Sequence, residues 1–221
     1  MRNGIDWPGL PDHIRAALEA IHAGATADSQ ESLTLEFKED PAQHLGKERA
    51  RADFFAKLID EAMCIANSEA ATGDIVVGVS DKTAGPNAFT GTGLVEEDIA
   101  RSIFNRTKPN MNVSVTSIDA WGARLVIIHV PEARALYTRQ DGAAKQRVAD
   151  SQFSCKPLTE EERRSIDEAR RSPDYSNAAS DLDIDNLRLA VITEARRILR
   201  THRENSGRGS AVPSTTTGLL R

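Results

Sequence analysis

The sequence predicts a compact α+β domain with a mixed sheet rather than a doubly wound one. Several separate segments carry apolar residues at the spacing of an amphipathic helix. Short apolar runs of strand length, alternating or continuous, lie between these segments. The resulting order is strand, helix, strand, helix, two strands, helix, which is typical of an α+β fold. We expect this domain to span about residues 28–165.

The composition indicates a globular protein whose core contains few aromatic side chains. Of the 221 residues, 39% are hydrophobic and 5% are aromatic, so mainly Ile, Leu, Val and Ala must build the core. No apolar run approaches the roughly 20 residues that span a bilayer, and the N-terminus lacks the apolar stretch of a signal peptide. We therefore expect a cytoplasmic protein. Cys64 and Cys155 match no metal-ligand or redox spacing, which predicts two reduced thiols.

The first half of the chain is predicted to hold two helices and two strands. Residues 11–23 carry apolar side chains at helical spacing, after a Pro-Asp pair that favours a helix start. Alternation of Leu and Phe with polar residues over 33–37 predicts a half-buried strand. Residues 47–68 have the widest apolar face, which indicates the central core helix. The continuous apolar run 75–79 predicts a strand covered on both faces.

The second half is predicted to continue with a loop, a helix and two strands. Residues 80–93 contain several Gly and a Pro, which indicate a loop, and 96–106 have helical spacing. Residues 113–118 and 124–130 predict two strands joined by a tight turn.

The end of the chain is predicted to add an edge strand and further helices. The edge strand is expected at 143–149, and a helix with a good N-cap and acidic first turn at 158–171. The chain then divides into an N-terminal helical segment (1–27), the domain (28–171), a linker with a C-terminal helix (172–205), and a polar tail expected to be disordered (206–221).

The charge pattern favours local rather than general contact with phosphates. The net charge of −5 and the pI near 5.6 exclude a protein coated in positive charge. Basic residues nevertheless cluster at the helix predicted at 96–106 and in the later loops, where they are candidates to neutralise phosphates. These candidates are Arg101, Arg106, Lys108, Arg139, Lys145 and Arg147. Apart from Tyr137, few aromatic residues lie among them, so base stacking is not indicated. The alternative interpretation is a set of solvated surface charges.

Three acidic residues are candidate metal ligands. Glu31 and Glu36 flank the polar face of the first strand, and Asp81 directly follows the buried strand. Carboxylates that converge at strand ends can hold a divalent cation through oxygen ligands. The alternative is that these acids are only solvated or support the fold.

The segment 31–38, Glu-Ser-Leu-Thr-Leu-Glu-Phe-Lys, resembles the "E-S-x-x-x-E-F-K" opening of the Schlafen AlbA-like domain. Other motifs of that family follow in the family's order. They are the "A-N" pair in 65–67, the "G-V-x-D" strand in 74–81, the last strand in 124–131, Tyr137 with the "R-x-G-S" segment in 147–151, and the "T-x-E-E" helix start in 157–162.

The sequence also departs from the family pattern. The paired glycine before the central strand is Thr72-Gly73, and Ala149 replaces the glycine of "R-x-G-S". The zinc-binding cysteines and histidine of the animal relatives are missing, as are the long second domain and winged helix of many relatives. The chain therefore resembles a short, prokaryote-like version of the family.

The resemblance implies an Alba-like fold that binds DNA or RNA. It also implies, from animal members that cleave transfer RNA, a three-carboxylate site holding Mg²⁺ or Mn²⁺. Matched residue by residue, the three acids are Glu31, Glu36 and Asp81, and Lys38 would neutralise a phosphate. The alternative is structural, with Glu31 capping the strand and Glu36 paired with Lys38 or Arg147.

The interpretation that follows is a nucleic-acid-binding domain, with a metal-dependent RNA endonuclease as the second hypothesis. A third is a protein-interaction or regulatory subunit that uses the helix expected at 181–203. A homodimer is expected by resemblance only. No nucleotide cofactor is expected because the chain has no G-x-x-x-x-G-K-[ST] motif. The five histidines show no metal spacing, and Ser32 and Ser80 have no evident general base.

Overall fold

A four-stranded mixed sheet forms the centre of the fold. The computed structural model describes residues 9–41, 48–150, 153–170 and 197–198. The strands, in spatial order, are β1 (Leu35–Lys38), β2 (Gly73–Val77), β5 (Ala123–Val130) and β4 (Ser114–Ala120). β1 and β2 run parallel, whereas β5 is antiparallel to both β2 and β4. This mixed arrangement confirms the predicted α+β class.

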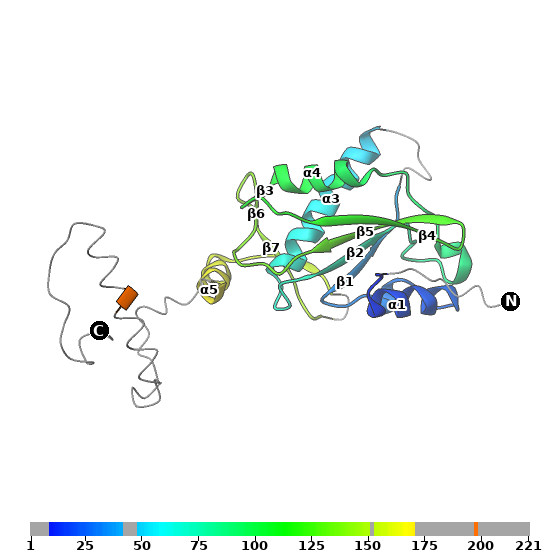
Figure 1. The fold of residues 1–221 in the computed structure, drawn as a ribbon, viewed down its shortest axis with the longest axis horizontal. Helices are drawn as coiled ribbons and strands as arrows, with labels where there is room; N and C mark the ends of the chain where they lie inside the picture. Colours follow the sequence, from blue (N-terminus) through cyan, green and yellow to red (C-terminus); the bar gives the residue numbers. More distant parts are fainter. Residues whose placement is uncertain (1–8, 42–47, 151–152, 171–196, 199–221) are drawn as a thin grey trace, which may run out of the picture. The chain divides into compact units, whose positions relative to one another are not determined.

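Helices cover both faces of the sheet (Figure 1). α1 (Asp12–His22) lies on one face, and α3 (Glu48–Asn67) with α4 (Glu96–Arg106) lies on the other. Alternation along β2 separates the two cores. Val76 packs with α1, and Ile75 and Val77 pack with α3 and α4. The helix at 96–106 has the bounds that the apolar spacing predicts.

Two short two-stranded sheets and the helix α5 (Glu160–Arg170) complete the compact unit, which spans Met1–Ser172. β3 (Thr107–Lys108) pairs with β6 (Thr138–Arg139), and β7 (Lys145–Arg147) pairs with β8 (Cys155–Pro157). α5 begins with a capping box, because Glu162 accepts hydrogen bonds from the backbone and hydroxyl of Thr159.

The first strand differs from the prediction of a half-buried strand at 33–37. β1 begins at Leu35, and Glu36 on its polar side is only 3% exposed. Both faces of β1 are covered, because Phe37 faces the α1 core while Glu36 forms ion pairs with Lys38 of β1 itself and with Arg147 of β7. Alternation of polar and apolar residues does not distinguish an ion-paired polar face from a solvated one.

The prediction of two reduced cysteines is wrong in this structure. Cys64 on α3 and Cys155 on β8 form a disulfide across 91 residues of sequence, with their Cα atoms 5.8 Å apart. The short strand β8 was also not predicted, because three residues are too few to show a period. Tertiary packing of β8 on α3 brings the two thiols together.

Several expected elements lie wholly or largely outside the described residues. They include the linker at 172–180, the tail at 206–221 and most of the helix expected at 181–203. Within the described ranges, no helix has the length and hydropathy needed to cross a bilayer.

Candidate functional site

A cluster of charged side chains lies between β1, α3 and β7. We call Glu31, Glu36, Lys38, Glu61 and Arg147 the charged cluster. Glu36 forms ion pairs with both Lys38 and Arg147. Glu61 of α3 approaches the same two cations, at 3.6 Å from Lys38 Nζ and 3.6 Å from Arg147 Nη1. Glu31 lies 3.8 Å from Arg147 Nη2. Two predicted carboxylates therefore converge, and two side-chain cations neutralise part of their charge.

Arg147 is the buried centre of this cluster. Its side chain is 1% exposed, and its Nε donates to the Ser32 carbonyl oxygen at 2.8 Å. Its Nη2 lies 3.4 Å from the Leu35 carbonyl oxygen. Arg147 and Lys38 were candidate phosphate ligands from the sequence, but the structure places both among carboxylates. These contacts match the alternative to metal binding that was given for Glu36 from the sequence, in which Glu36 supports the fold by pairing with Lys38 or Arg147.

Two carboxyl groups of the cluster, those of Glu31 and Glu61, are held in an environment that disfavours their charge. Burial, followed by the charge of Glu36, raises the pKa of Glu31 to about 7, although Lys38 and a backbone hydrogen bond from Phe37 oppose this. Burial likewise raises the pKa of Glu61. Burial alone would lower the pKa of Lys38, but Glu36 and Glu61 outweigh it and the net shift is upward. The cluster therefore contains three carboxyl groups but only two basic side chains, which cannot neutralise all three negative charges.

Glu61 is a member of the site that sequence reasoning missed. A signal existed, because this charged residue interrupts the apolar face of α3 three residues after Leu58 and four before Ile65. A lone acid on a core-facing stripe needs a buried partner. Its partners come from β1 and β7, far away in the sequence.

Asp81, the third predicted carboxylate, follows β2 beside the cluster. Burial raises its pKa, and its charge interacts with those of Lys38, Asp28 and Glu36. Its Oδ1 atom is buried and has no hydrogen-bond partner within the described part of the chain. An unsatisfied buried carboxylate oxygen is costly, so this atom marks a position where a donor or cation would be stabilising.

The cluster as it stands does not fit a bound metal ion. Among residues 9–41, 48–150 and the other described ranges, no three His, Cys, Asp or Glu side chains are arranged to hold one. Both carboxylate oxygens of Glu36 already form ion pairs, one with Lys38 and the other with Arg147. The oxygen donors are of the type that Mg²⁺ and Mn²⁺ prefer, but side-chain cations occupy them.

A second feature is a groove of about 560 Å³ between α3 and α4. Arg51 of α3 and Arg101 and Arg106 of α4 line it, and we call it the α3–α4 groove. A neighbouring hollow of about 280 Å³ is lined by Arg106 and by Arg139 of β6. Arg106 therefore stands where the two hollows meet.

The basic residues around the groove differ in how far they are already neutralised. Asp98 lies 2.5 Å from Arg101 and 3.6 Å from Arg51. Within the described ranges, the contact given for the Lys108 side chain is a hydrogen bond to the backbone carbonyl oxygen of Gln140 at 3.4 Å. Exposed Arg106 has no ion-pair partner among the described residues. The predicted residues Arg101, Arg106, Lys108 and Arg139 thus gather in one region, and Arg51 joins them.

Lys145 and Arg139 share one acid beneath this surface. Asp60 of α3 lies 2.5 Å from Arg139 Nε and 2.7 Å from Lys145 Nζ. Lys145 therefore ties β7 to α3. Its charge is paired with Asp60, in contrast to the exposed charge of Arg106.

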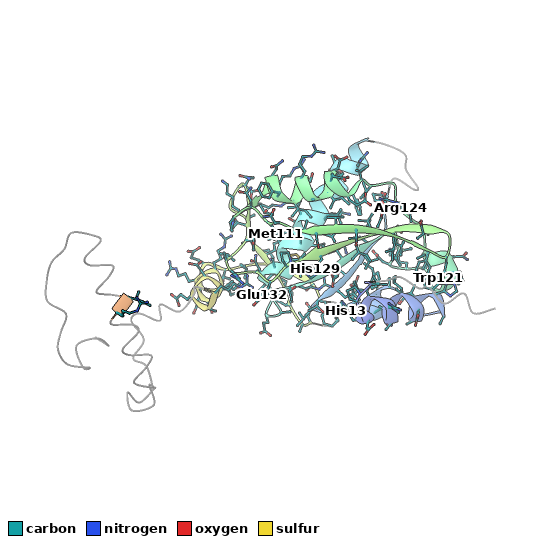
Figure 2. All side chains as sticks on the ribbon, in the orientation of Figure 1. His13, Met111, Trp121, Arg124, His129 and Glu132 are labelled. Carbon is teal, nitrogen blue, oxygen red and sulfur yellow. A yellow bond between two sulfur atoms is a disulfide. The ribbon has the colours of Figure 1, made fainter. Side chains whose placement is uncertain are left out.

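Two histidines contact the same acid, Asp74, on the face of the sheet opposite to the charged cluster. His13 Nε2 lies 3.0 Å and His129 Nδ1 2.9 Å from the two carboxylate oxygens of Asp74. Figure 2 shows His13 on α1 and His129 on β5. Asp74 is 6% exposed in its side chain and follows Gly73 in β2. The arrangement joins α1 to the sheet.

The fold and the charged cluster define an α+β domain in which the edge strand supplies acids to a buried ion-pair network. Residues 31–156 match the family Schlafen, AlbA_2, and the chain belongs to this family. This match covers the charged cluster, Asp81 and the α3–α4 groove.

Other comparisons add information on the fold alone. No curated protein matches the chain. Among solved structures, the chain is similar to the DIP2311 protein from Corynebacterium diphtheriae, with 24% identity and a TM-score of 0.54. The similarity covers 84% of this chain but 38% of that protein, so the chain spans well under half of its solved neighbour.

Proposed function

We propose that this chain binds nucleic acid by its phosphate backbone along the α3–α4 groove. The observation that carries the proposal is the position of Arg106, an exposed cation between two hollows with no ion-pair partner in the described structure. Arg51, Arg101 and Arg139 surround it. Membership of the Schlafen, AlbA_2 family supports the same class of ligand.

The charges favour backbone contact over recognition of bases. Guanidinium groups bind phosphate oxygens in a bidentate manner, and such contacts need no particular base. Because the net charge of the chain is −5, only a local patch is positive, and long-range attraction is opposed by the rest of the surface. Asp98 keeps Arg51 and Arg101 close together until a phosphate competes for them. Binding is therefore expected to weaken steeply with salt.

The first test is the Arg106→Ala variant, assayed by fluorescence anisotropy on labelled single-stranded and hairpin RNA and the matching DNA. Losing one phosphate contact is expected to lower affinity about tenfold on every sequence and to reduce the salt slope by about 1. Arg164→Ala on α5 is the matched control, because Arg164 is also exposed but pairs with Glu160 and does not line the groove. Equal affinity of wild type and Arg106→Ala would remove the groove from consideration.

The second candidate is metal-dependent cleavage of RNA by Glu31, Glu36 and Asp81. What favours it is the unsatisfied Asp81 Oδ1 atom, together with the raised pKa of both Glu31 and Asp81. A divalent cation is the chemistry that would supply the missing positive charge there. In the described arrangement Lys38 and Arg147 hold Glu36, so we derive no catalytic step through a metal.

Cleavage is tested by incubating the protein with total transfer RNA and Mn²⁺ beside a Glu36→Ala variant. Cleavage by the wild type and by Arg164→Ala, but not by Glu36→Ala, would establish the nuclease. Intact RNA whose mobility shifts in a salt-dependent way would leave binding as the function.

A further inference from the structure

We propose that the Cys64–Cys155 disulfide is a redox-responsive clamp that holds Arg147 in the charged cluster. This is a modification site, acted on by dithiols, and it does not depend on whether the chain binds nucleic acid. The bond joins the two segments that supply opposite charges to the cluster, α3 with Glu61 and the β7–β8 hairpin with Arg147.

The register of the hairpin places the bond at the cluster itself. Cys155 is the direct pairing partner of Arg147 in the β7–β8 ladder. Cys64 follows Glu61 by three residues, which is one helical turn of α3. The disulfide therefore fixes the distance between α3 and the backbone opposite Arg147, and with it the reach of the guanidinium toward Glu36 and Glu61.

The hairpin is small enough for one cross-link to control it. Each of its strands has three residues, and a two-stranded hairpin of this size is marginal without outside support. In β8, Lys156 and Pro157 are exposed, and Cys155 is the residue directed at α3. β7 has its own attachments, through Lys145 to Asp60 and through Arg147 to the cluster. Loss of the bond is therefore expected to loosen β8 first and β7 with it.

The two cysteine residues differ in exposure, which suggests the course of reduction. Cys64 is fully buried, whereas Cys155 is half-buried at the edge of the domain. A dithiol attacks as thiolate at Cys155 Sγ, forms a mixed disulfide there and releases Cys64 as the leaving thiolate. Its second thiol then displaces Cys155 and closes a disulfide within the reductant. Two electrons and two protons pass from the dithiol to the protein, which ends with two thiols.

The position of the disulfide indicates that its role is not limited to stabilising the fold. The two hydrophobic cores are built from the sheet, α1, α3 and α4, and β8 contributes little apolar surface to them. A domain of this size folds on such cores without a disulfide. The bond instead ties down the segment that neutralises buried acids. Reduction then allows Arg147 to leave Glu31 and Glu61, whose pKa values are already raised.

The test compares oxidised protein with protein reduced by dithiothreitol, using hydrogen exchange followed by mass spectrometry. Alkylation of the native oxidised protein should modify neither cysteine, and alkylation after reduction should modify both. Reduction is expected to speed exchange of the backbone amides in 145–147 and 155–157 at least tenfold. At early exchange times, before global unfolding contributes, exchange in β5 at the centre of the sheet should stay unchanged.

Cys155→Ser provides a second route to the opened state without a reductant. It should show the fast hairpin exchange of the reduced wild type, and dithiothreitol should then change nothing further. Equal hairpin exchange in oxidised and reduced wild type would overturn the proposal. So would free reactivity of both thiols in protein purified and kept under air. Nucleic-acid affinity measured on the same samples is a separate readout, so failure of binding and failure of the clamp are distinguishable.

Discussion

At the scale of single residues, the charged cluster shows how burial changes the meaning of a motif. Glu31 and Glu36 are recognisable in the sequence, but their roles depend on Lys38, Glu61 and Arg147. A buried carboxylate with a raised pKa lowers stability at neutral pH, and natural proteins keep such strain mainly at functional sites. The raised pKa of Glu31 therefore adds support to the proposal that this cluster is a functional site.

The Glu31→Gln variant is expected to be more stable than the wild type at pH 8. The pKa of Glu31 is raised from 4.5 to about 7 in the folded protein, so the folded state binds the proton more tightly than the unfolded state. Its contribution to stability is thus most favourable below pH 4.5 and is lost as the pH rises to about 7. After allowance for solvent screening, the gain in unfolding free energy at pH 8 is on the order of 1 kcal/mol.

Urea unfolding of both proteins from pH 4 to pH 8 measures this difference. The two curves should converge at the acid end and separate as the pH rises. Glu161→Gln on α5 is the control for the Glu-to-Gln change itself, because Glu161 is exposed and lies outside the charged cluster. A constant offset between wild type and Glu31→Gln at every pH would show that the pKa of Glu31 is not raised.

At the scale of elements, the parallel pairing of β1 with β2 positions the site. Asp74 of β2 donates its backbone N–H to the Thr34 carbonyl oxygen at 2.7 Å, at the start of both strands. This contact sets the register that pairs Glu36 with Ile75 and Lys38 with Val77. The cluster therefore depends on a close approach of two backbones at Gly73.

The Gly73→Ala variant is expected to be destabilised by roughly 1–3 kcal/mol through overpacking. A Cβ atom at this position would lie 2.5 Å from the Thr34 carbonyl oxygen and 2.9 Å from Ile65 Cγ2. The backbone oxygen cannot rotate away, so β1 must shift. Gly93→Ala is the matched control, because its added Cβ would meet none of the described atoms within 4 Å. Thermal unfolding of the two variants should differ clearly, and equal midpoints would contradict the close approach.

At the scale of the whole molecule, the disulfide joins distant parts of the chain across 91 residues. Closing a loop of that length restricts the unfolded state and is expected to add about 4 kcal/mol of stability. Oxidised protein should therefore unfold at a higher urea concentration than protein in dithiothreitol. In the double variant Cys64→Ala with Cys155→Ala, dithiothreitol should have no effect. A wild-type midpoint that does not change on reduction would contradict this expectation.

Much of the architecture could be predicted from the sequence because it depends on local periodicity. The apolar spacing of 96–106 matches α4, and the continuous run at 75–79 overlaps the fully buried β2. The capping box at Thr159 and Glu162 likewise marks the start of α5. These features arise from side chains a few residues apart, so they are readable one segment at a time.

The sequence by itself determined the α+β class, the order of the main elements and the motif residues Glu31, Glu36 and Asp81. Only the tertiary structure decided that Arg147 lies buried against two of these acids, that Glu61 completes the cluster, and that Cys64 bonds to Cys155. The physical reason is the separation in sequence over which each kind of interaction acts. Periodicity and capping act between near neighbours, whereas ion pairing and disulfide formation join residues that only the packing of α3 on β1 and β7 brings together.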